Sequence, residues 1–130
     1  MSQDLGRLLL RLGVGGMLFL HGLFKIEHGV AFIEGMVRGH GLPGFLAWAV
    51  YLGEVAAPIC LVLGLWTRLA GLAIAVDMLV ALALVHAHEL GHLGMAGGWA
   101  VELPALYLVG GLVAALLGGG RYAVGKGRWS

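Results

Sequence analysis

Charged residues are scarce in this sequence of 130 residues: they make up 12% of the chain, about half of the roughly 25% found in ordinary soluble domains. Lys and Arg form no run, and the formal net charge is only +1, so nothing indicates a nucleic-acid partner. The one cysteine, Cys60, excludes an intramolecular disulfide and a Cys-x-x-Cys pair. We interpret Cys60 as a small, buried apolar residue.

Apolar residues and glycine are abundant instead. Hydrophobic residues make up 60% of the chain, 24 residues are glycine, and the mean hydropathy is +0.94. Glycine is more frequent in membrane helices than in soluble ones, where it allows helices to pack closely. The composition therefore predicts an all-α integral membrane protein whose main partner is the lipid bilayer.

Four apolar segments are long enough to cross a bilayer core of roughly 30 Å. They cover residues 5–24, 45–65, 69–85 and 100–117, which predicts a four-transmembrane-helix bundle in a single domain over residues 1–130. The first segment begins with basic residues but no small-x-small cleavage site follows, so we expect an uncleaved helix. Between the first two spans, Phe32, Ile33, Met36 and Val37 fall at helical spacing beside the pair Glu34 and Arg38. This pattern predicts a short interfacial helix in the first outer loop.

The distribution of basic residues predicts the orientation. Six of them belong to the amino end, the turn at 66–68 and the tail, against Lys25 and Arg38 on the other side: Arg7, Arg11, Arg68, Arg121, Lys126 and Arg128. Cytoplasmic loops carry the excess of Lys and Arg, so both termini are expected in the cytoplasm. We expect Arg7 and Arg11 to snorkel to the inner interface.

The segment from Tyr51 to Arg68 contains one carboxylate, Glu54, four residues before Pro58. Proline lacks an amide hydrogen and crowds the carbonyl four residues back, so the helix should be weakened at Glu54. Acids inside membrane helices usually face a bundle interior or a wet cavity, which makes Glu54 a candidate catalytic residue. The alternative is a protonated glutamate that hydrogen-bonds a neighbouring helix.

A second acid, Asp77, interrupts the third span at a similar depth, roughly 12 to 14 Å from the membrane surface by the rise per residue. Two carboxyl groups this deep would share a proton if they lie close together. His21, Lys25, His86, His88 and Glu102 cluster at the outer ends of helices, so the polar residues outline a funnel from outside. On a regular helix His88 shares a stripe with Asp77, whereas His86 points the other way.

The residues His88-Glu89-Leu90-Gly91-His92 match the His-Glu-x-x-His pattern of zinc hydrolases. A third ligand would have to be Glu102 or His86. The motif lies across the end of a span and runs into several glycines, which hold a rigid helix poorly. We therefore favour a solvated loop over a metal site of His88, His92 and Glu102, and no metal cofactor is firmly predicted.

Several motifs, in order, resemble the DoxX family of small four-helix membrane proteins. They are LLLRLGVGGMLFLHGLFKIE, GLP at 41–43, GEVAAPICLVLGLWTRLAG, the histidine that closes the third helix, and GGGRYAV. The resemblance covers nearly the whole chain and marks His21, Gly22, Lys25, Glu54, Thr67, Arg68 and His86 as positions of the family pattern. Glu102 comes a little later than that pattern expects, and Gly125 stands where the tail usually has an acid.

The resemblance implies a role in membrane redox chemistry, at the plasma membrane of a bacterium or archaeon. We expect a subunit of a quinone-linked oxidoreductase with quinone as its ligand. Because no haem, flavin or nucleotide motif is present, we also expect a soluble or membrane redox partner. Glu54, His21, His86 and Asp77 are the expected catalytic residues, and Lys25, Glu102, His88 and Tyr51 the expected ligand-binding residues. The alternative class is a non-enzymatic membrane adaptor or small-molecule-binding protein. A homo-oligomer is compatible with either class.

The predicted topology is testable by cysteine labelling in intact cells. An impermeant thiol reagent should modify cysteines introduced at Gly35 and Gly94, because both loops are expected outside. A cysteine at Lys126 should be spared, because the tail is expected in the cytoplasm. Labelling at position 126 instead would reverse the orientation.

Overall fold

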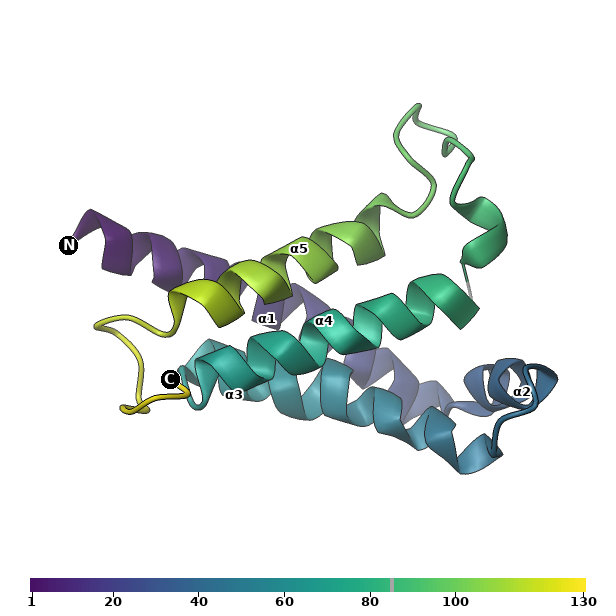
Figure 1. Cartoon of the computed structure of the whole chain (residues 1–130), viewed down its shortest axis with the longest axis horizontal. Coiled ribbons are helices and arrows are strands. Elements are labelled where there is room, and N and C mark those ends of the chain that lie inside the picture. The colour runs from purple at the N-terminus through teal and green to yellow at the C-terminus, as the bar shows by residue number, and fades with distance from the viewer. Residues whose placement is uncertain (85) are drawn as a thin grey trace.

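The computed structural model describes residues 1–84 and 86–130, and the protein is all-α. Five α-helices are seen in this described part of the chain: α1 (Ser2–His28), α2 (Ala31–Gly39), α3 (Ala57–Leu63), α4 (Thr67–Leu84) and α5 (Glu102–Leu117). A 3-10 helix η1 (Gly44–Ala49) and a π-helix η2 (Leu52–Ala56) lead into α3, and a single 3-10 turn η3 (Ala87–Glu89) follows α4. Both termini lie at one end of the bundle, and α2 lies at the other (Figure 1).

Three helical segments are long and apolar enough to cross a membrane, namely Ser2–His28, Gly44–Leu63 and Thr67–Leu84. They correspond to the first three predicted spans, although the predicted end of the third span at Val85 lies outside the described residues. The segment α5 is also apolar but shorter, with 16 residues. The short helix expected in the first loop is α2, and its Arg38 pairs with Glu34 at 2.7 Å.

The second span is less regular than the sequence predicts. It begins as the 3-10 helix η1, passes through α-helical Val50 and Tyr51, widens into the π-helix η2 around Glu54 and continues as α3 from Ala57. Pro58 explains the π-turn, because it cannot donate to the Glu54 carbonyl and its ring would collide with that carbonyl in a regular α-helix. The expected weak point at Glu54 is therefore a change of helix type.

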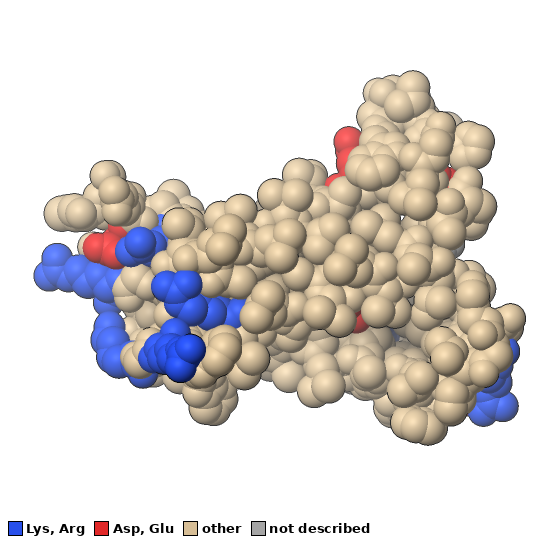
Figure 2. Space-filling view, in the orientation of Figure 1, with Lys and Arg blue, Asp and Glu red and all other residues tan. Residues whose placement is uncertain are grey.

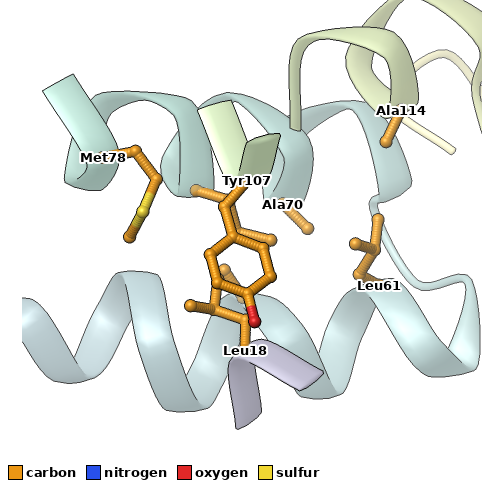
Figure 3. Close-up of a cluster of buried hydrophobic side chains, with 8 residues drawn as sticks. Leu18, Leu61, Ala70, Met78, Tyr107 and Ala114 are labelled. Carbon is orange, nitrogen blue, oxygen red and sulfur yellow. The ribbon is translucent and has the colours of Figure 1, made fainter. Parts of the chain in front are cut away.

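One stripe of α1 faces the rest of the bundle and consists of Arg11, Gly15, Leu18 and Gly22. Gly22 allows the closest approach, because a Cβ at this position would overlap the backbone carbonyl of Glu54. Gly71 of α4 and Gly111 of α5 meet in a similar way, each against the other's carbonyl. The hydrophobic core lies between these crossings, with Leu18, Leu61, Ala70, Met78, Tyr107 and Ala114 among its buried members (Figure 3).

Arg11 does not snorkel to the interface, so the prediction for this residue is wrong. The side chain is 1% exposed and donates hydrogen bonds to the carbonyls of Leu61 (3.0 Å), Val62 (3.1 Å) and Gly119 (2.8 Å). The last carbonyls of a helix have no partner within it, and the guanidinium supplies one at the end of α3. Arg11 thereby ties α1 to the end of α3 and to the carboxyl-terminal tail.

The carboxyl-terminal tail closes the end of the bundle where both termini lie. Its backbone amides at Val124 and Gly125 donate to the carbonyls of Leu63 and Gly64, at 3.0 Å each, and the Arg68 amide donates to the Trp129 carbonyl. Lys and Arg gather at this end on the face that Figure 2 shows, in the orientation of Figure 1. The basic cluster expected from the sequence is thus a fixed surface of the fold.

The close approach at Gly22 predicts a position-dependent response to a single added methyl group. Gly22→Ala should destabilise the protein by about 1 to 3 kcal/mol, because α1 must move away from the Glu54 backbone. Gly16→Ala is the matched control, since a Cβ there meets nothing within 4 Å, and alanine in a helix is neutral or stabilising. Unfolding in detergent measures both, and equal stability of the two variants would contradict the proposed packing.

Candidate functional site

A cavity of about 830 Å³ extends along α4 from Leu69 to Leu84 and reaches α2. Aliphatic side chains of α4, η1, η2 and α5 form most of its wall, and α2 contributes Phe32, Ile33 and Val37. Six titratable side chains also line it: His21, Lys25, Glu54, Asp77, His86 and Tyr107. A largely apolar cavity of this size with a few convergent polar groups is typical of a small-molecule site.

The shortest polar contact in the wall joins two helices. Lys25 of α1 donates from Nζ to Glu54 Oε2 of η2 at 2.5 Å, and the Glu54 residue is 5% exposed. Tyr51 lies behind this pair, where its hydroxyl donates to the Lys25 carbonyl at 3.0 Å. Tyr51 does not line the cavity. Glu54 thus contacts a neighbouring helix, α1, through the side chain of Lys25.

Asp77 of α4 lies beside this ion pair. Its side chain packs against Gly53, since a Cβ on Gly53 would overlap the Asp77 Cβ and Cγ. The Asp77 Oδ2 atom is buried and accepts no hydrogen bond from the described part of the chain. A buried polar atom without a partner is costly, so such an atom on a cavity wall is a natural contact for a ligand or water.

The two histidines of the wall differ in their surroundings. His21 of α1 meets the Tyr107 ring edge to face, with 5.7 Å between ring centroids. His86 follows α4 and lines the cavity, and its Nδ1 lies 3.5 Å from Glu89 Oε2 without making a hydrogen bond to any described residue. A neutral imidazole ring has one nitrogen that donates a hydrogen bond and one that accepts, so each histidine can contact a ligand in either role.

His88 does not take the position that a regular helix predicts. The helix α4 ends at Leu84 and η3 is a single 3-10 turn, so the stripe through Asp77 does not continue to His88. The His88 side chain is 76% exposed, lies 3.3 Å from Glu89 and is absent from the cavity wall. His86, which was expected to point away, is the histidine that reaches the cavity.

The remaining candidates lie outside the cavity. Glu102 begins α5 as an exposed residue, and its carboxylate lies close to Gly98, while His92 is exposed in the connection before α5. The His-Glu-x-x-His pattern requires both histidines on one helix, whereas His88 belongs to a 3-10 turn that His92 follows. No group of three His, Cys, Asp or Glu side chains within residues 1–84 and 86–130 is arranged to hold a metal ion.

The sequence reasoning missed Tyr107. This residue of α5 is 7% exposed, lines the cavity and projects toward Leu18 (Figure 3). A signal was available, because Tyr107 is the one hydroxyl-bearing residue between Glu102 and Leu117. Buried tyrosines usually use their hydroxyl.

Together these features define the class: a small helical membrane protein whose ionisable side chains line an apolar cavity. The chain belongs to the DoxX family, whose profile matches residues 6–87. It is also similar to a protein of Bacillus subtilis (strain 168) named Putative oxidoreductase CatD, with 32% identity over 87 residues. That match covers 65% of this chain and 62% of the relative, so the chain spans less than two thirds of the relative's length. No solved structure matches the chain.

The ion pair predicts a non-additive response to substitution. Lys25→Met should destabilise the protein by about 2 kcal/mol or more, because it leaves the Glu54 carboxylate buried without its partner. The double variant Lys25→Met/Glu54→Leu should recover most of this loss, because no charge is left unpaired. Unfolding in detergent, in a double-mutant cycle, measures the coupling.

Arg38→Met is the control for this prediction. Arg38 forms an ion pair with Glu34, but its side chain is 67% exposed, so its loss should cost at most about 1 kcal/mol. If Lys25→Met costs no more than Arg38→Met, the Lys25–Glu54 pair does not stabilise the bundle.

Proposed function

We propose that this chain is a four-span membrane subunit of a quinone-linked oxidoreductase, and that its cavity binds a quinone ring. The observation that carries the proposal is the group formed by the Lys25–Glu54 ion pair and the unpartnered Asp77 Oδ2 on the wall of an otherwise aliphatic cavity. The apolar wall suits an aromatic ring, the Lys25 ammonium can donate a hydrogen bond to a ring oxygen, and the two carboxyl groups can exchange protons.

Membership of the DoxX family and the name of the Bacillus subtilis relative support a redox role. The reduction of a quinone to a quinol consumes two electrons and two protons. Side chains of this chain can hold and transfer protons, but none of the sequence motifs carries electrons. The electrons must therefore come from a redox partner or a reduced substrate.

The side chains have distinct roles in this proposal. Lys25 can donate a hydrogen bond to a quinone oxygen, because its ammonium has three donors and Glu54 uses one of them. The carboxyl groups of Glu54 and Asp77 accept and pass on protons next to the ring, and His21 and His86 pass protons between these acids and the aqueous phase. Tyr51 holds Lys25 in place from behind, through the Lys25 carbonyl.

The proposed orientation of the chain determines which side of the membrane the site faces. With α5 as the fourth span and the basic end in the cytoplasm, α2 lies at the outer interface of the plasma membrane. The part of the cavity that α2 lines then faces the outer side. Protons taken up through His86 would come from the outer aqueous phase.

The test compares Glu54→Gln with Glu54→Leu in the native membrane. The Gln variant should fold, because its size and hydrogen bonding are nearly preserved, but quinone-linked turnover should fall on the order of a hundredfold with the loss of the proton-exchanging group. Quinone retained after gentle extraction, measured by mass spectrometry, should fall as well. Glu27→Gln, at an exposed position of α1, is the matched control and should change neither quantity.

A Leu variant that is more stable and fully active would show that Glu54 is only a buried polar contact. Purified wild-type protein that holds neither quinone nor metal would instead favour the non-enzymatic adaptor. The first result would contradict the role of Glu54, and the second would contradict the proposed function itself.

A further inference from the structure

A second, smaller hollow of about 230 Å³ lies in the crevice between α3 and α4. Its floor consists of small side chains, Ala57, Cys60 and Ala70, and its rim carries the larger side chains Leu52, Leu69 and Trp66. The rim residues are 66%, 51% and 60% exposed, respectively, so the hollow opens to the outside of the bundle. Apart from the Trp66 indole and the Cys60 thiol, the described residues that line it are aliphatic.

This hollow borders the cavity of the candidate site. Leu52, Leu69 and Ala73 line both spaces, and the apolar groove extends from these shared residues toward the turn at Trp66. Between Leu52 and Cys60 the groove follows the second span for roughly 12 Å along the helix axis. We refer to it as the α3–α4 groove.

The chemistry of the α3–α4 groove limits its occupant. A water molecule in it would find almost no hydrogen-bond partners, and water occupies apolar hollows poorly. An aliphatic chain can fill the space between small floor residues and a large rim through close contacts of many atoms. The exposed rim lets such a chain enter sideways from the bilayer.

We propose that the α3–α4 groove binds the hydrocarbon tail of the same molecule whose ring occupies the cavity. The natural ligand is then a membrane-resident quinone with a long aliphatic tail. This inference rests on the proposed function, because the tail needs a ring to anchor it. The lining residues that the groove shares with the cavity favour this occupant over the acyl chain of an unrelated phospholipid, because a tail in the groove would start at the wall of the cavity.

Two quinones with the same ring distinguish the contribution of the tail to binding from that of the ring. Phylloquinone carries a phytyl tail, and dimethylnaphthoquinone has a methyl group in its place. Both should bind the detergent-purified full chain, but phylloquinone should bind about tenfold more tightly, which corresponds to about 1.4 kcal/mol. Cys60, the one cysteine of the chain, reports occupancy of the groove, and only phylloquinone should slow its alkylation by a maleimide.

Ala56 lines the groove but not the cavity, and it is exposed, so a larger side chain has room there. Ala56→Phe should lower the affinity for phylloquinone to that for dimethylnaphthoquinone and leave the latter unchanged, and Ala56→Leu should have a smaller effect in the same direction. Ala83→Phe is the matched control, because Ala83 is an exposed residue of α4 that lines neither space.

Each outcome separates the groove from the cavity. If both probes bind equally and Cys60 reacts at the same rate with either, the tail does not occupy the groove, although the proposed function stands. If added phospholipid protects Cys60 and phylloquinone does not, the groove is an ordinary lipid contact and the inference is wrong. If neither probe binds, both the proposed function and this inference fail.

Discussion

The fold depends on how two basic side chains of α1 find hydrogen-bond partners inside an apolar bundle. Arg11 near one end of the helix is 1% exposed and gives its donors to carbonyls at the end of α3 and in the tail. Lys25 near the other end gives a donor to Glu54. A buried cation without a partner is expensive, so each of these contacts fixes the position of α1 against the second span.

The close packing between these two contacts follows from small residues. Gly15 and Gly22 bring α1 against the backbone of the second span, and Gly71 and Gly111 bring α4 against α5. Lipid tails are as apolar as leucine, so membrane helices gain from close van der Waals contact rather than from the hydrophobic effect. The crossing at Gly22 lies against Glu54, so the close packing of α1 borders the wall of the cavity.

The irregular second span places the candidate site within this geometry. Because Pro58 imposes a π-turn at Leu52–Ala56, the backbone that carries Glu54 departs from α-helical spacing. The Glu54 carboxylate reaches Lys25 while Gly53 leaves room for the Asp77 side chain. The same segment also borders the α3–α4 groove through Leu52 and Ala56, so one local distortion serves the ion pair, the cavity and the groove.

The sequence by itself determined the helical class, the long apolar segments, the short helix α2 and the family, because apolar runs, glycine content and ordered motifs are local properties. It also identified Glu54, Lys25, Asp77 and His21, since an ionisable residue in an apolar run is visible without a fold. Spacing failed for His88, because the end of α4 at Leu84 changes the register on which a helical stripe depends.

Only the tertiary structure decided which groups the buried polar side chains contact. The burial of Arg11 requires carbonyls from residues 61, 62 and 119, which the sequence could not bring together. The selection of His86 over His88, the contribution of Tyr107 and the position of the α3–α4 groove beside the cavity also depend on contacts between distant segments. The physical reason is that a buried polar group must find its partner wherever the packing provides one, and packing is set by the whole bundle.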